Sequence, residues 1–336
     1  MNRDRLSLSY LAWFFFSVLA FSATFLLLSA FFEPIAGDLT RVGRWSERDF
    51  GWNHPQPFIP LRANGPSLTD PDVLVLGDSY SASNVWQSYL AESRNLKILS
   101  FSYPNIGCID NWLRWVANRP YPTISTVVIE TAERNLVPLF RKISACADRA
   151  PIPFEIAAGN IYPTRFRSSL TQDVTYLFLT AINTLRLALD HGRIASAGVI
   201  NVPLTNDRLF SNHQAHRLLY YVEDEDKRNW TKEHITTAVE NLLRIQKDFA
   251  KNGLRLIVIV VPDKSSAYRQ YLSLEEERVG YPDVFQQLDD AGVNSVNLFK
   301  FFQQAIQDTV DLYNPNDTHL SAQGSRMMAA KVAALF

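Results

Sequence analysis

The fold is decided by one short stretch, Asp72-Val73-Leu74-Val75-Leu76-Gly77-Asp78-Ser79. Its apolar part is short and rich in β-branched residues, which is typical of a strand buried on both faces in a parallel sheet. Ser79 stands just past the carboxyl end of that strand, where open α/β sheets bind their ligands. The stretch therefore predicts an α/β domain with a polar side chain at its ligand-binding edge.

The same pattern continues along the chain. Three further short apolar runs predict buried strands, at residues 98–101, 126–129 and 254–261. Apolar residues at helical spacing over residues 231–252, followed by Gly253 as a carboxyl cap, predict a helix, and residues 111–117 predict another. Because strands and helices alternate, we expect a three-layer α/β/α sandwich with a central parallel sheet over residues 71–336.

Residues 150–230 break this alternation, and we interpret them as an insertion that shapes the substrate cleft. The chain of 336 residues, 47% hydrophobic and 20% charged, is long enough for one large domain with an appendage. Its formal net charge of −1 gives no global field that would recruit nucleic acid, so no nucleic-acid partner is expected.

The amino terminus carries an apolar segment without charge over residues 6–32. It is long enough to span a bilayer, whereas the core of a cleaved signal peptide is shorter, about 7 to 15 residues. We therefore expect a transmembrane anchor over residues 9–32 after a short cytoplasmic tail of residues 1–8, with a cleaved signal peptide as the alternative. Prolines in residues 33–70 indicate an extended stem that packs loosely on the domain.

Two short motifs supply the parts of a nucleophilic site. Ser79 offers a hydroxyl, and the later Asp317-Thr318-His319 offers an imidazole that can take its proton and a carboxylate that can orient the imidazole. This Asp-Thr-His follows a turn signal and precedes residues 321–336, which indicate a capped terminal helix. The competing interpretation is that Ser79 only caps a helix and His319 is an ordinary loop histidine.

The sequence shows no recognisable coenzyme A or nucleotide cradle, so no cofactor is expected, and its cysteines and histidines predict no metal site. The two cysteines, Cys108 and Cys146, either pair in an oxidising compartment or remain buried thiols. Neither they nor the six histidines show a spacing typical of zinc ligands.

Three motifs together resemble a known family. They are Val128-Ile129-Glu130-Thr131-Ala132-Glu133-Arg134-Asn135-Leu136, Val261-Pro262-Asp263-Lys264 with Tyr268, and Asp317-Thr318-His319-Leu320-Ser321. With Gly77-Asp78-Ser79 they resemble the SGNH hydrolase superfamily, in the branch typified by alginate O-acetyltransferases. The resemblance extends over residues 71–336, with its best motifs at the two ends. Leu320 stands where those enzymes often have a tryptophan, and the serine precedes the Asp-x-His pair, as in the superfamily at large.

The resemblance implies roles for further residues. The oxyanion would be held by the amides of Ser79 and Gly107 and by a side chain for which Asn135 is the candidate. Arg134, Glu130 and Tyr80 would bind substrate. Gly107 has an alternative role as a turn residue with positive φ, and Arg134 could instead form an ion pair with Glu130 at the i, i+4 spacing.

The resemblance also implies a function and a location. The chain would be an O-acetyltransferase of exopolysaccharide biosynthesis, as in alginate biosynthesis, that works through an acyl-serine intermediate. Its catalytic domain would lie in the periplasm on a single-pass anchor in the bacterial inner membrane. A membrane-bound O-acyltransferase partner would supply the acyl group, and a polysaccharide would accept it. The alternatives are an esterase that uses the same residues and a non-catalytic polysaccharide-binding scaffold.

Overall fold

The centre of the molecule is a five-stranded, all-parallel sheet. The computed structural model describes residues 3–32, 36–61, 70–144, 146, 150–153, 159–161, 174–278 and 280–336. The sheet runs in the spatial order β10 (Ser295–Val296), β9 (Arg255–Val261), β4 (Thr126–Ala132), β2 (Val73–Gly77) and β3 (Ile98–Ser102). In chain order this is 2-1-3-4-5, the doubly wound arrangement in which ligands bind where the strand order reverses. That reversal places the site at the carboxyl end of β2.

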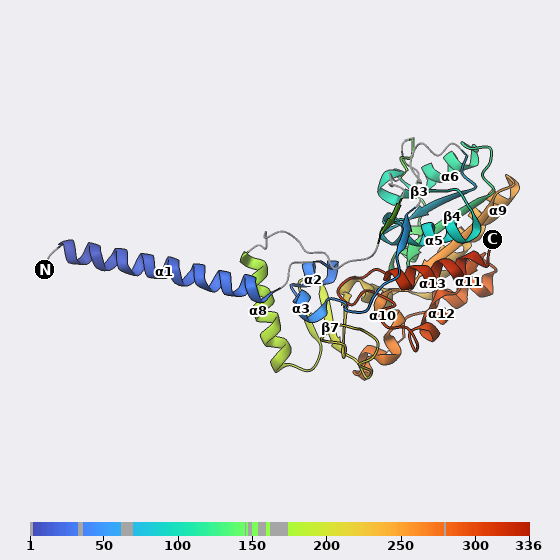
Figure 1. Ribbon diagram of the computed structural model, residues 1–336. Coiled ribbons are helices and arrows are strands. Elements are labelled where there is room, and N and C mark those ends of the chain that lie inside the picture. Colours follow the sequence, from blue (N-terminus) through green and yellow to red (C-terminus); the bar gives the residue numbers. More distant parts are fainter. Residues whose placement is uncertain are drawn as a thin grey trace.

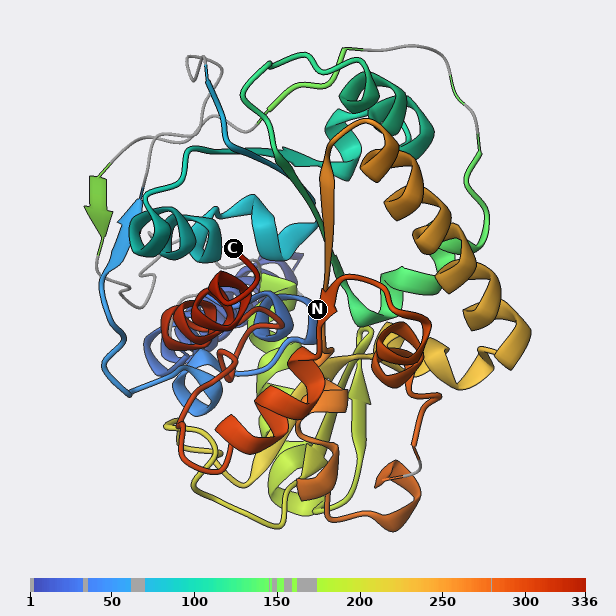
Figure 2. The same ribbon diagram turned by 90° about the vertical axis from the view of Figure 1, so that its right-hand side faces the viewer.

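Helices cover both faces of this sheet (Figure 2). Val73 and Val75 point to the layer formed by α5 (Val85–Arg94), α12 (Leu298–Ala305) and α13 (Ala322–Ala333). Leu74 and Leu76 point to the other layer, formed by α6 (Ile109–Ala117), α7 (Glu133–Arg141), α9 (Lys232–Lys251) and α11 (Val284–Ala291). The predicted three-layer α/β sandwich is confirmed. Short helical turns complete the domain: η1 (Tyr103–Asn105), α10 (Lys264–Ala267), η3 (Arg269–Tyr271) and η4 (Glu275–Arg278).

The region predicted as an insertion adds a small helix-and-sheet layer, and Ile200, Val202 and Leu218 of this layer belong to the same core as the central sheet. It contains α8 (Val174–Leu189), the antiparallel sheet of β6 (Ile194–Ser196), β7 (Val199–Pro203) and β8 (Arg217–Tyr221), and then η2 (Val222–Asn229). In addition, β5 (Gly159–Ile161) pairs antiparallel with β1 (Ile59–Leu61). Residues 154–158 and 162–173 of the region lie outside the described residues.

The stem differs from the extended segment that its prolines indicated. Its first half folds into α2 (Asp38–Gly43) and α3 (Glu47–Phe50). Leu39, Trp45 and Phe50 are buried against the small antiparallel sheet, where they contact Val199 and Leu219. Most prolines of the stem lie after α3, so they gave no indication of the structure of the part that contains α2 and α3.

The amino-terminal helix α1 (Arg3–Phe31) projects from the body of the molecule, and α8 lies across its carboxyl end (Figure 1). Within α1, Ser9–Ser29 is long and apolar enough to cross a membrane. The sequence left open whether the two cysteines pair. In the structure Cys108 and Cys146 form a disulfide, with their Cα atoms 6.2 Å apart.

Candidate active site

Ser79 begins the short helix α4 (Ser79–Ala82), directly after β2. The Asp78 carboxylate caps this helix, because it accepts a hydrogen bond from the Tyr80 amide at 3.1 Å. The turn is tight enough to require Gly77: a Cβ there would lie 2.2 Å from Ser81 Oγ and 2.6 Å from the Glu130 carboxylate. This turn leaves Ser79 exposed at the edge of the sheet.

Asp317 and His319 form a hydrogen-bonded pair on the loop before α13. His319 Nδ1 lies 2.6 Å from Asp317 Oδ1, and the same oxygen accepts the His319 amide at 2.9 Å. Burial disfavours ionisation of Asp317, but the hydrogen bond and charge of His319 outweigh it and lower the pKa of Asp317 to about 2. Burial also disfavours protonation of His319, yet its hydrogen bond to Asp317 and the surrounding carboxylates raise the pKa of His319 above its usual value.

Tyr80 joins the serine turn to the histidine loop. Its hydroxyl donates to the Thr318 carbonyl at 3.0 Å, and its ring packs edge-to-face on His319 with 5.1 Å between centroids. Within the described residues no hydrogen bond joins Ser79 to His319, and His319 Nε2 is buried without a partner. The ring of His319 thus packs on the residue after Ser79, and its Nε2 makes no hydrogen bond within the described residues.

A cavity of about 270 Å³ opens beside this pair. Its lining includes Tyr80, Trp86, Asn314, Asp317 and His319. Tyr80, expected to bind substrate, thus reaches this cavity while its hydroxyl holds the histidine loop.

Asp38 is a third member of the site that the sequence motifs did not reveal. Its amide donates to Asp317 Oδ2 at 3.0 Å, its Oδ1 accepts the Thr318 amide at 2.8 Å, and its Oδ2 lies 3.8 Å from His319 Nδ1. Burial and the charge of Asp317 raise the pKa of Asp38 to about 6. No local pattern could have identified it, because it comes from the stem, 279 residues before Asp317.

The same three side chains lie close enough to share a cation, since their ligand atoms are within 4.8 Å of one another. The hydrogen bonds above already use three of the four carboxylate oxygens of Asp38 and Asp317. These contacts account for the cluster without an ion.

Lys264 fixes the loop that carries the pair. Its buried ammonium donates to the carbonyls of Asn314 at 2.7 Å, Pro315 at 3.0 Å and Asp317 at 3.1 Å. Burial lowers the pKa of Lys264 to about 7 despite the nearby carboxylates. No role for this lysine could be predicted from the sequence, because its three partners are backbone atoms some fifty residues away.

Arg134 is part of a buried ion network. Its guanidinium lies 2.5 Å from Asp263 and 3.1 Å from Asp224, and Lys227 joins the network at 2.6 Å from Asp263. The alternative pairing with Glu130 is wrong. The Arg134 side chain itself stays 16% exposed, so its expected contact with substrate remains a prediction.

Glu130 does not face a substrate. It is fully buried behind the serine turn, where its carboxylate accepts the Ser81 hydroxyl at 2.6 Å and the Asp78 amide at 3.2 Å. Burial and the charge of Asp78 raise its pKa well above the usual value. Glu130 therefore holds the serine turn in place from the protein interior. The expectation that it binds substrate is wrong, because its side chain is fully buried.

Besides the Ser79 amide, the two predicted oxyanion donors are Asn135 and Gly107, and within the described residues neither forms a hydrogen bond with Ser79. Asn135 donates to Asp78, the residue before Ser79, at 3.3 Å. Gly107 has φ +79° in the turn after β3 and lines a different cavity, together with Tyr103 and Lys142. Their roles as donors stay predictions.

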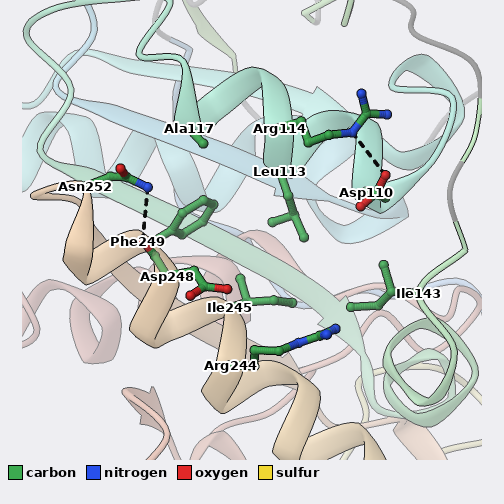
Figure 3. A pocket seen from close by; sticks show the side chains of 10 residues that line it. All are labelled: Asp110, Leu113, Arg114, Ala117, Ile143, Arg244, Ile245, Asp248, Phe249 and Asn252. Carbon is green, nitrogen blue, oxygen red and sulfur yellow. Dashed lines mark hydrogen bonds and ion pairs between the residues drawn. The ribbon is translucent and has the colours of Figure 1, made fainter.

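Another cavity of about 270 Å³ lies away from this site, between α6 and α9 (Figure 3). Its polar lining contains an exposed ion pair, Arg114 with Asp110 at 3.1 Å, and the separate side chains Arg244 and Asp248. It holds none of the residues of the candidate active site.

A comparison with protein families identifies this region of the chain. Residues 218–336 match the SGNH hydrolase-like domain of acetyltransferase AlgX. The match confirms the predicted resemblance for the carboxyl-terminal part of the chain, which includes Asp263, Lys264, Asp317 and His319. Ser79 and Asp38 lie outside the matched residues. A search of curated proteins finds no match.

Proposed function

We propose that the chain is a membrane-anchored serine O-acetyltransferase that transfers acetyl to hydroxyls of an exported polysaccharide. The observation that carries the proposal is the 2.6 Å Asp317–His319 contact with an unpartnered Nε2, at the sheet edge that also bears Ser79. The match to the domain of an acetyltransferase favours acyl transfer among the reactions open to such a site.

In the proposed reaction, His319 Nε2 takes the proton of the Ser79 hydroxyl as Ser79 Oγ attacks the acyl carbonyl. The Asp317 carboxylate accepts a hydrogen bond from Nδ1–H of His319, which orients the imidazole and stabilises the imidazolium. His319 then returns the proton to the leaving group, and Ser79 carries the acyl group as an ester. A sugar hydroxyl attacks this ester, His319 takes its proton, and the Ser79 hydroxyl is regenerated.

The developing oxyanion needs donors at the same edge of the sheet. We assign this role to the amides of Ser79 and Gly107 and to the Asn135 side chain. One well-aimed donor typically contributes about 3 kcal/mol to the transition state. Asn135 already contacts the residue before Ser79, which makes it the first side chain to test.

Two features support the proposed location. The apolar helix Ser9–Ser29 supports a single-pass anchor, and the Cys108–Cys146 disulfide supports a catalytic domain in an oxidising compartment, the periplasm of a bacterium. The family resemblance implies that a membrane-bound O-acyltransferase supplies the acyl group.

The test is an acetyl-transfer assay on the full chain in detergent, with an activated acetyl ester and oligosaccharide acceptors. We expect acetylated sugar from the wild type and from the control Ser93→Ala, an exposed residue near the end of α5, and none from Ser79→Ala. If the enzyme releases acetate at the same rate with and without sugar, and no acetylated sugar forms, the chain would be an esterase instead. Binding of the polymer without any serine-dependent product would identify a scaffold.

A further inference from the structure

The helix α8 presents an apolar stripe that the rest of the described structure does not cover. Its members lie at helical spacing and are exposed: Phe178 (36%), Ile182 (52%), Leu185 (61%) and Leu189 (76%). The sixteen residues of α8 include one charge, Arg186. A contiguous apolar surface of this kind marks an interaction site in a folded protein.

Two polar residues of α8, Thr180 and Asn183, lie on the opposite side of the helix and are buried in the protein. Asn183 donates to the carbonyls of Gly43 and Arg44 and to Ser196 Oγ, at 3.0, 3.0 and 2.8 Å. Leu187 is buried with the stem and the small antiparallel sheet. The helix is therefore held firmly on the domain with its apolar stripe outward.

The contacts of α8 with α1 fix where this stripe lies. Phe178 stacks on Phe21 with 6.3 Å between ring centroids, and Leu177 and Tyr176 pack in one cluster with Phe25 and Leu28. A membrane crossing takes about 20 residues, and every window of that length within the uncharged residues 6–32 contains both Phe21 and Phe25. When α1 spans the bilayer, the part of α8 around Phe178 lies at the depth of the hydrocarbon layer.

We propose that α8 is a second membrane element, which lies in the lipid interface with its apolar stripe in the acyl chains. At sixteen residues it is about 24 Å long, too short to cross the hydrocarbon core of about 30 Å. It lies across the end of α1 (Figure 1), an orientation suited to the plane of the membrane. Together α1 and α8 hold the domain on the membrane at a set angle.

This attachment keeps the active site near the membrane. Asp38 follows the end of α1 at Phe31 by seven residues, which span at most about 25 Å even when fully extended. His319 lies beside Asp38, so the proposed acyl acceptor has to reach the site close to the lipid surface.

The test uses the full chain in phosphatidylcholine nanodiscs with an environment-sensitive fluorophore on one introduced cysteine. The two native cysteines are joined in the disulfide, so an introduced thiol is labelled alone. The test positions are Ile182→Cys and Leu185→Cys; the controls are Leu19→Cys in the span and Glu240→Cys on the exposed side of α9. Quenching by brominated acyl chains and by aqueous iodide is measured for each.

We expect strong bromolipid quenching and little iodide quenching at positions 19, 182 and 185, and the reverse at position 240. Iodide quenching at 182 and 185 equal to that at 240, with position 19 in lipid, would place the stripe in water and overturn the proposal. Protection of 182 and 185 from both quenchers would show that a second copy of the chain covers the stripe, which would also overturn it.

Discussion

His319 lies between two carboxylates, Asp317 at 2.6 Å and Asp38 at 3.8 Å, and both favour its protonated form. A general base acts in its neutral form, so activity rises as the pH passes upward through the pKa of His319. Asp317 could be predicted from the sequence, because it stands two residues before His319 in a short motif. Asp38 could not, because the tertiary structure alone brings it to the imidazole.

We predict that Asp38→Asn moves the acid limb of the pH profile of kcat/KM to lower pH. The amide keeps an oxygen for the Thr318 amide but removes a negative charge that raises the pKa of His319. The matched control is Asp248→Asn, an exposed carboxylate on α9, which leaves the profile in place. If kcat/KM falls equally at every pH and the acid limb stays in place, Asp38 only holds the loop that carries His319 and does not affect the pKa of His319.

Lys264 holds the backbone of the loop that carries Asp317 and His319. We predict that Lys264→Met lowers kcat by about 10²-fold, because three carbonyls of the loop lose their donor and the Asp317–His319 pair is misplaced. Steady-state kinetics with a soluble ester measure the effect, and Lys251→Met, an exposed lysine, is the control. Wild-type kcat in the Lys264 variant would contradict this role.

At the scale of elements, the parallel strands and their flanking helices were predictable, because buried strands are apolar runs and helices repeat every 3.6 residues. The predicted strand at 254–261 is β9 (Arg255–Val261), and the predicted helix at 231–252 is α9 (Lys232–Lys251). The helical part of the stem was not predictable, because α2 and α3 are too short to show a period and depend on tertiary burial.

The stem contacts the loop before α13, which carries Asp317 and His319, through Gly37. A Cβ at Gly37 would lie 2.0 Å from the Asn316 carbonyl oxygen, so Gly37→Ala must push the stem and the loop apart. We predict a loss of about 1–3 kcal/mol in the free energy of unfolding, together with reduced kcat. Gly280→Ala, where the nearest atom is the end of the Arg269 side chain at 3.5 Å, should change neither quantity.

Denaturant unfolding and ester hydrolysis measure the two effects of Gly37→Ala. Stability and kcat that both match the wild type would show that the stem does not depend on this close contact. A loss of stability with unchanged kcat would separate the stem from the loop before α13 and contradict the coupling.

At the scale of the whole molecule, one chain joins a helix long and apolar enough to span a membrane to the turn that carries Ser79 and the loop that carries His319. The stem links them: Glu47 accepts hydrogen bonds from the Gly37 amide at 2.7 Å and from Asn316 at 2.9 Å. The sequence indicated the anchor and the catalytic domain separately. Their physical connection could not be predicted, because it depends on contacts between residues about 270 positions apart.

The most direct test of the account is to trap the acyl group on the enzyme. The full chain is mixed with an activated acetyl ester without an acceptor, quenched in acid, digested and analysed by mass spectrometry, beside Ser79→Ala and His319→Ala. We predict one acetyl group on the peptide that contains Ser79 in the wild type and none there in either variant. An acetyl group on another residue, with Ser79 unmodified in an active wild-type enzyme, would contradict the central claim that Ser79 is the nucleophile.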